Sequence, residues 1–239
     1  MIKRITSMQN PQFRELLKLR KSSACREKNR IVVEGEDLVE MAYGSGQLDG
    51  LIALDEQRQY GDIDQIIVSP AMMARLSGNK SPSKMLGLAH LNEGAETGDR
   101  VVVLDNVQDP GNVGTILRTA LSFSYSSVVL LPHCASKFNE KVIQSSKGAI
   151  FRIPIFENVS LEELKERGLK IVSTSLQGAV DYRTATVREP FALVFGNEGQ
   201  GISENTLQNS DLLIKIEMHN MDSLNVAVAA GILMNHYRK

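Results

Sequence analysis

The chain has little cysteine, with only Cys25 and Cys134 among its 239 residues. The two lack C-x-x-C spacing, and no zinc-ligand pattern accompanies the four histidines, so neither a disulfide nor a bound metal is expected. Long apolar runs are also absent. Residues 1–20 lack the apolar core of a secretory signal, and no stretch of the sequence approaches membrane-spanning length. We expect a cytoplasmic protein with no membrane partner.

Net charge is low as well, at −1, and by itself does not suggest a polyanionic partner. Its distribution is uneven. Residues 1–30 hold nine Lys or Arg against two Glu, a net +7, whereas residues 31–100 hold five basic and twelve acidic side chains, a net −7. A phosphate-facing patch and a solvated helix face explain this concentration equally well.

The first part of the chain is expected to alternate between helices (11–20, 37–43) and strands (30–34, 51–54, 65–68). At 92–98 polar residues and glycine replace the apolar pattern, which predicts two domains, 1–96 and 97–239. The second part is expected to contain strands at 101–104, 128–131, 153–156, 170–173, 191–195 and 212–216. Runs such as VVVL and VVLL indicate a parallel sheet covered by helices on both faces, with its ligand at the carboxyl ends of the strands.

A first candidate segment, residues 104–122, reads LDNVQDPGNVGTILRTALS. It predicts a strand, a Pro-Gly turn and a helix capped by Asn112. The apolar stripe of that helix leaves out Arg118, which lies roughly 130° from the stripe centre and faces away from the core. Such an arginine is most often an ordinary solvated residue. Its position near the start of a helix that follows a strand also suits a ligand site.

A second segment, residues 191–201, reads FALVFGNEGQG, an apolar strand that ends in a glycine loop. The G-x-x-G-x-G order is not the dinucleotide fingerprint and no P-loop lysine follows, so we reject a nucleotide-phosphate loop. Glycine permits a ligand to approach the backbone closely, which makes Glu198 a candidate site residue. A plain turn is the alternative.

A third segment, residues 213–234, reads LIKIEMHNMDSLNVAVAAGILM. Ser223 and Asn225 stand where a polar loop meets a helix, and Ser223 can also serve as a helix cap. The helix expected at 224–234 is apolar on nearly every face, so both of its sides need cover. We therefore expect a homodimer with this helix near the interface.

Together the three segments resemble the motifs of the SpoU (TrmH-type) branch of the SPOUT methyltransferases, in order and spacing, over roughly residues 99–239. The N-terminal half is similar to the RNA-binding domain of that family through ITSMQNPQFRELLKLR and RIVVEGEDLVEMA. The resemblance implies an α/β fold: a C-terminal trefoil-knotted domain with a mostly parallel sheet, and a small N-terminal α/β domain like kink-turn-binding ribosomal proteins. A knot is an exception to the rule against threaded connections.

The resemblance further implies methyl transfer from S-adenosylmethionine to a ribose 2′-hydroxyl of structured RNA, by a homodimer and without a metal. Ribosomal RNA is the first expectation and transfer RNA the second, because an appended domain suits large structured RNA. The implied catalytic residues are Asn112, Arg118, Glu198, Ser223 and Asn225. The implied cofactor-binding residues are Gly196, Ile216, Ser223, Leu224 and Asn225.

Arg118 matches the arginine that helps to activate the hydroxyl oxygen, since a guanidinium is too weak an acid to be an easy base. The third segment departs from the family pattern, because Ile-Pro-Met is replaced by Ile216, Glu217 and Met218 and the loop is one residue shorter. A non-catalytic RNA-binding or ribosome-assembly protein is therefore the main alternative. Methylation of a base nitrogen is the second, and a nucleotide-dependent oxidoreductase is a distant third.

Overall fold

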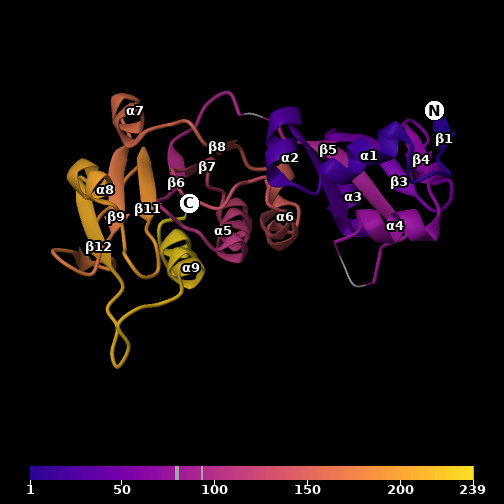
Figure 1. The fold of residues 1–239 in the computed structure, drawn as a ribbon. Coiled ribbons are helices and arrows are strands. Elements are labelled where there is room, and N and C mark those ends of the chain that lie inside the picture. The colour runs from indigo at the N-terminus through magenta and orange to yellow at the C-terminus, as the bar shows by residue number, and fades with distance from the viewer. Residues whose placement is uncertain (79–80, 93, 239) are drawn as a thin grey trace.

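The computed structural model describes residues 1–78, 81–92 and 94–238, so residue 93 of the expected break at 92–98 lies outside the described part. Two β-sheets lie side by side, each with its own helices (Figure 1). The first sheet ends at His90 and the second begins at Arg100. No helix in the described ranges is long and apolar enough to cross a membrane.

The N-terminal sheet is mixed, with the strand order β1-β4-β3-β5-β2 in the described part of the chain. β5 runs antiparallel to β2 and β3, while β4 runs parallel to β1 and β3. Its strands are β1 (Ile2–Arg4), β2 (Arg30–Glu34), β3 (Leu48–Ala53), β4 (Gln65–Ile67) and β5 (Met85–His90). Its helices are α1 (Pro11–Lys18), α2 (Ser22–Lys28), α3 (Glu36–Gly44), α4 (Pro70–Leu76) and the 3₁₀ turn η1 (Arg58–Tyr60).

The C-terminal sheet has the order β10-β12-β9-β11-β6-β7-β8, and every described pairing in it is parallel. Its strands are β6 (Arg100–Leu104), β7 (Ser127–Leu130), β8 (Ile155–Phe156), β9 (Lys170–Thr174), β10 (Val180–Asp181), β11 (Phe191–Phe195) and β12 (Leu212–Lys215). Its helices are α5 (Pro110–Ser122), α6 (Glu140–Ser146), α7 (Leu161–Glu166), α8 (Glu204–Asn209), α9 (Val226–His236) and the 3₁₀ turn η2 (Ala149–Phe151).

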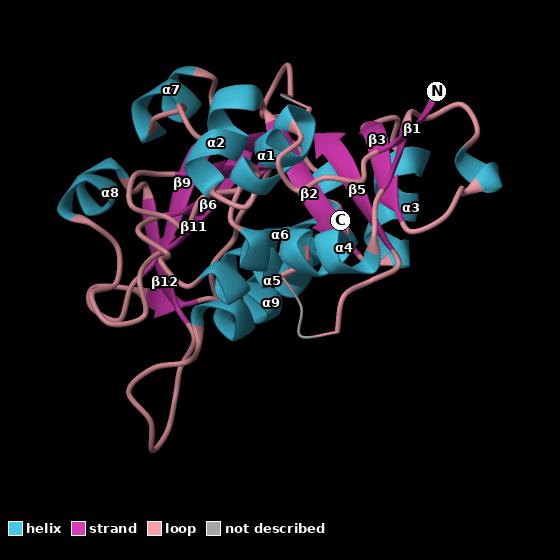
Figure 2. Ribbon diagram, turned by 45° about the vertical axis from the view of Figure 1, so that its right-hand side comes forward, coloured by secondary structure: helices cyan, strands magenta, loops and turns pink. Residues whose placement is uncertain are grey.

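Strand β6 is buried on both faces, as its unbroken apolar run predicts. Val101 and Val103 pack in one cluster with α7, whereas Val102 and Leu104 belong to the larger core that contains α5. Figure 2 shows α5, α6 and α9 gathered on one side of the sheet, with α7 and α8 on the other. Parallel strands covered by helices on both sides confirm the α/β class and the mostly parallel sheet.

The start of α5 differs from the expectation that Asn112 caps it. Asp109 is the cap, and its side chain accepts a hydrogen bond from the backbone N–H of Asn112 at 3.0 Å. The reason is local: an Asp followed by Pro110 combines a good cap with the residue best suited to the first helical position. Asn112 therefore lies inside the first turn, which leaves its side chain available for other contacts.

The start of α9 also differs from the expected position at residue 224. Asn225 is the cap, and its Oδ1 accepts from the N–H of Ala227 at 2.9 Å and of Val228 at 3.3 Å. Ser223, the cap considered from sequence, lies two residues earlier in the exposed loop. Several predicted strands also extend one or two residues beyond the observed ones; for example, β8 begins at Ile155, β12 ends at Lys215 and β4 ends at Ile67.

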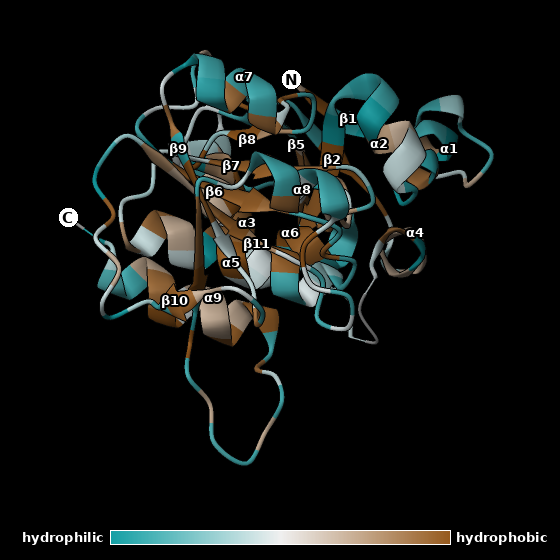
Figure 3. Ribbon diagram, turned by 90° about the vertical axis from the view of Figure 1, so that its left-hand side faces the viewer, coloured by the Kyte–Doolittle hydropathy of each residue, from teal (hydrophilic) through white to brown (hydrophobic). Residues whose placement is uncertain are grey.

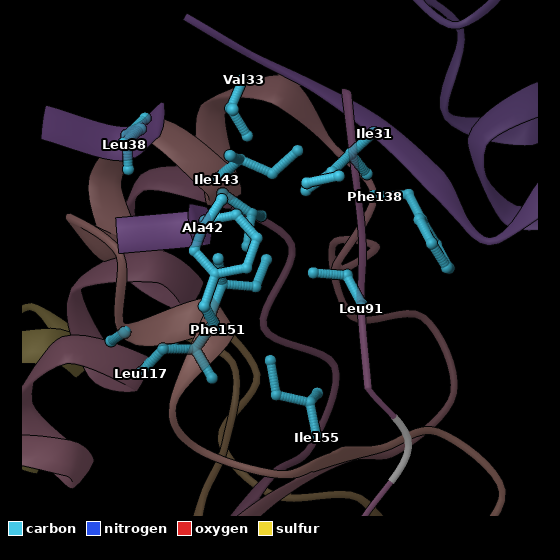
Figure 4. Close-up of a cluster of buried hydrophobic side chains, with 14 of the residues drawn as sticks. Ile31, Val33, Leu38, Ala42, Leu91, Leu117, Phe138, Ile143, Phe151 and Ile155 are labelled. Atoms are coloured by element: carbon cyan, nitrogen blue, oxygen red, sulfur yellow. The ribbon is translucent and has the colours of Figure 1, made fainter. Parts of the chain in front are cut away.

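The two sheets share one apolar core (Figure 4). Ile31 and Val33 of β2 belong to the same buried cluster as Ile143 of α6 and Phe151 of η2. A hydrogen bond reinforces this contact, because the buried Gln47 side chain donates to the carbonyl oxygen of Phe151 at 2.7 Å. The N-terminal sheet is thus docked on the α6 side of the C-terminal one.

Candidate active site

A cavity of about 480 Å³ lies at the carboxyl edge of the C-terminal sheet. Its walls come mainly from the ends of three parallel strands and the loops that follow them, namely 174–177 at β9, 195–202 at β11, and Lys215, Ile216 and Met218 at β12. Ser223, Leu224 and Val226, at the start of α9, complete these walls. Carboxyl ends of parallel strands meet at one edge, which is where open α/β sheets hold their ligands. The volume falls within the range of small-molecule sites, about 300–1,000 Å³.

Gly196 allows the loop after β11 to fold back on itself. A Cβ placed on Gly196 would lie 2.3 Å from the carbonyl carbon of Gly201 and 2.4 Å from the nitrogen of Ile202, so no side chain fits there. Two backbone hydrogen bonds of 2.9 Å between Asn197 and Gly201 close the loop. The requirement for glycine at position 196 is therefore a close approach of two backbone segments at the rim of the cavity.

Asn197 is a structural residue that the sequence reasoning missed. Its Oδ1 accepts from the N–H groups of Gly199 at 2.9 Å and Gln200 at 3.1 Å, and its Nδ2 donates to the carbonyl oxygen of Asn106 at 3.0 Å. Asn197 thus shapes the glycine loop and ties it to the end of β6. An asparagine two residues before a loop glycine is a recognisable turn signal.

Asp105 makes a second tie between the same two loops. This carboxylate is only 4% exposed and accepts from the backbone N–H of Ser203 at 2.6 Å. Its signal in the sequence was a carboxylate directly after the buried VVVL run. Together, Asp105 and Asn197 hold the first and second predicted segments against each other.

Three predicted site residues form one hydrogen-bonded chain. Asn225 Nδ2 donates to Asn112 Oδ1 at 3.1 Å, and Asn112 Nδ2 donates to the Glu198 carboxylate. The direction of this chain is determined by α9, because Asn225 Oδ1 accepts the N–H groups at the helix start and only its Nδ2 remains to face Asn112. Glu198 is then the acceptor at the end of the chain.

Asp109 holds the backbone of Asn112 through a hydrogen bond. The backbone N–H of Asn112 lowers the pKa of the Asp109 carboxyl below its ordinary value, and Lys141 adds to this effect through a hydrogen bond of 3.2 Å. The carboxylate at the N-terminus of α5 also interacts favourably with the helix dipole. The position of Asn112 is therefore determined by the cap of its own helix as well as by its neighbours.

The remaining predicted residues divide into two groups. Gly196, Ile216, Ser223 and Leu224 line the cavity beside Glu198. Arg118 does not line it. Arg118 is exposed on α5, and in the described part of the chain its guanidinium has no ion pair or hydrogen bond.

The basic N-terminal segment is partly neutralised within the protein. Glu15 pairs with Lys18 at 2.6 Å and Lys28 at 2.5 Å, and these contacts lower the pKa of Glu15 to about 2. Arg26 and Arg30 also have acidic partners, Glu157 and Asp49. Within the described ranges, the cations of residues 1–30 without an ion pair are Lys3, Arg4, Arg14, Arg20 and Lys21. The free positive charge is smaller than the composition suggested.

Comparison with known proteins identifies the family of the chain. Residues 99–235 match the model of the SpoU rRNA Methylase family, a range that contains all three segments. The chain is 34% identical over 247 residues to the 23S rRNA (guanosine(2553)-2′-O)-methyltransferase RlmP of Bacillus subtilis, with 99% of this chain and 100% of that protein covered.

Solved structures agree along the whole chain. The crystal structure of an rRNA methyltransferase from Sinorhizobium meliloti superposes with a TM-score of 0.89 at 26% identity, covering 100% of this chain and 99% of that one. The crystal structure of an AdoMet-bound rRNA methyltransferase from the same organism superposes with a TM-score of 0.87 at 25% identity and the same coverage. The chain therefore belongs to the SpoU rRNA methylase family and is an S-adenosylmethionine-dependent RNA methyltransferase.

Proposed function

We propose that the protein methylates a ribose 2′-hydroxyl of structured ribosomal RNA. The observation that carries this proposal is the hydrogen-bonded chain of Asn225, Asn112 and Glu198 beside a ligand-sized cavity. The similarity along the full length to an enzyme named for 2′-O-methylation of 23S rRNA supports both the ribose position and ribosomal RNA. Transfer RNA is the second candidate substrate.

The cavity suits S-adenosylmethionine in size and in the character of its walls. Leu176, Ile216 and Leu224 provide apolar surface for a flat purine ring, while Gln177 and Ser223 offer polar groups for its edges. The loop after β11 presents backbone close to the cavity because residue 196 has no side chain. When bound, the cofactor supplies an electrophilic methyl group on a sulfonium.

The residues of the chain supply positioning and charge for the attack on that methyl group. The Asn225–Asn112–Glu198 chain places two amides and a carboxylate at the cavity rim in a single orientation, which satisfies the need for aligned reacting groups. The positive charge of Arg118 stabilises the negative charge that develops on the hydroxyl oxygen, whose proton passes to solvent. Because Arg118 lies outside the cavity of its own chain, we propose that it acts at the cavity of a second subunit.

A homodimer also explains the outer surface of α9. Val228 is 52% exposed on this helix, and Met221 and Leu224 in the preceding loop are 71% and 36% exposed. Figure 3 shows α9 in tan and brown at the edge of the molecule, although its other face is buried against α5. An apolar face of this kind, adjacent to the site, suits a twofold contact between identical chains.

We also propose a domain boundary near residue 96. Residues 1–96 bind the RNA, and residues 97–239 form the knotted methyltransferase domain. The protein acts in the cytoplasm. The free cations near α1 and α2 support RNA binding by the first part. The path of the chain supports the knot, since it leaves β12 near one edge of the sheet and returns to pack α9 against α5.

Substitution of Arg118 tests the chemistry. We expect Arg118→Ala to reduce transfer of labelled methyl from S-adenosylmethionine to unmodified ribosomal RNA by about 10²-fold or more, with unchanged cofactor binding. Arg188→Ala, which removes another exposed arginine, serves as the matched control and keeps full activity. No transfer by a folded wild-type protein, together with no rise in its melting temperature at millimolar S-adenosylmethionine, would favour the non-catalytic alternative.

Substitution of Asn225 tests the direction of the hydrogen-bonded chain. An Asp at this position still caps α9 but cannot donate to Asn112 and adds a negative charge near Glu198. We expect Asn225→Asp to retain its melting temperature and lose about 10- to 100-fold in kcat/KM. Asn205→Asp on α8 makes the same change of charge away from the site and keeps normal kinetics. Normal kinetics in Asn225→Asp would contradict the proposed role of the chain.

Light scattering tests the dimer. We expect the wild type to be a dimer at micromolar concentrations and Val228→Glu to be a monomer, because burying an unpaired carboxylate in an apolar interface is unfavourable. Met8→Glu, the same kind of change at an exposed apolar residue in the N-terminal part of the chain, leaves the dimer intact. A monomeric wild type would contradict the proposal.

A further inference from the structure

A second cavity, of about 350 Å³, opens at the same edge of the C-terminal sheet. Residues 130–135 after β7 and residues 157–158 after β8 form one side of it. Arg26 of α2 and Asn29, from the N-terminal part of the chain, form the other side. This cavity lies at the junction between the two sheets and is separate from the one lined by Glu198.

Lys137 is the unusual feature of this cavity. The residue is only 7% exposed, and its Nζ donates to the carbonyl oxygen of Ile155 at 3.3 Å and lies 5.6 Å from the centre of the Phe138 ring. No carboxylate in the described part of the chain lies within 4.0 Å of Nζ to balance it. An ammonium has three donors, and burying its charge without a counterion is unfavourable.

The other charged groups at the cavity compensate each other. Arg26 forms an ion pair of 3.1 Å with Glu157 and donates to Ser136 Oγ at 3.3 Å. The positive charge of Lys137 therefore remains unmatched. A ligand with one negative charge and several acceptor oxygens would satisfy both the charge and the unused donors of the ammonium.

We propose that this cavity binds one phosphodiester group of the RNA substrate, with Lys137 as its main contact. The inference rests on the proposed function, because RNA is the polymer that carries such groups to this edge of the sheet. The two cavities lie close enough together for one RNA strand to reach both. β7 is separated from β11 by β6 alone, so the two strand ends are about 10 Å apart.

The loops between the cavities are also joined directly. The N–H of Ala135 after β7 donates to the carbonyl oxygen of Val107 after β6 at 2.9 Å, and Asn106 in that same loop accepts from Asn197. An RNA strand that delivers its ribose to the first cavity can thus place a neighbouring phosphate in the second. The Lys137 site would link the N-terminal part of the chain to the position of the reacting nucleotide.

The test compares Lys137→Met with the wild type in binding to an unmodified transcript of Bacillus subtilis 23S rRNA across a salt series. Methionine fills a similar space without charge. We expect about tenfold weaker binding, a plot of log affinity against log salt that is shallower by about 0.7 to 0.9, and unchanged S-adenosylmethionine affinity. We also expect an equal or higher melting temperature, because the buried unpaired charge is gone. Lys165→Met on α7, far from this edge, leaves RNA binding unchanged.

Two results separate failure of the site from failure of the proposed function. An unchanged salt slope with a lower melting temperature would show that Lys137 only supports the fold, which overturns the phosphate site. A wild type that does not bind the transcript would overturn ribosomal RNA as the substrate and the phosphate site with it. If Lys137→Met does not fold, Lys137→Gln replaces it, because glutamine keeps a donor for the carbonyl oxygen of Ile155. The slope of log affinity against log salt then tests the phosphate site in the same way.

Discussion

The cap of α9 determines how the three site segments meet. Asn225 must use its Oδ1 to accept the first N–H groups of the helix, so its amide nitrogen points to Asn112, whose own nitrogen then points to Glu198. These contacts connect residues that are 113 and 86 positions apart. The capping of α9 thereby orients the Glu198 carboxylate at the cavity rim.

The parallel sheet provides the second constraint. Because its described pairings all run in one direction, the loops after β6, β7, β9, β11 and β12 meet at one edge. Asp105 and Asn197 fasten two of these loops together, and the Ala135 contact fastens a third. The proposed sites for the cofactor, the ribose and the phosphate then all lie along one edge of the sheet. The N-terminal sheet is docked beside this edge.

The sequence was sufficient for features that depend on local patterns. Buried strands, the apolar stripe of α5 that leaves Arg118 exposed, and the three motifs can all be read from short segments. Features that depend on distant partners could not be predicted. The Asn112–Glu198 contact, the pairing of Arg26 with Glu157 and the isolation of Lys137 arise only when the chain is folded. Asp109 was a local signal that was overlooked in favour of Asn112.

Analysis of the RNA product is the most direct test of ribose methylation. The wild-type protein would be incubated with S-adenosylmethionine carrying a labelled methyl group and with unmodified ribosomal RNA, and the RNA would then be digested to nucleosides for mass analysis. Ribose methylation predicts a labelled 2′-O-methyl nucleoside whose methyl stays on the sugar fragment and whose base has its normal mass. A labelled methyl on the base fragment would contradict it.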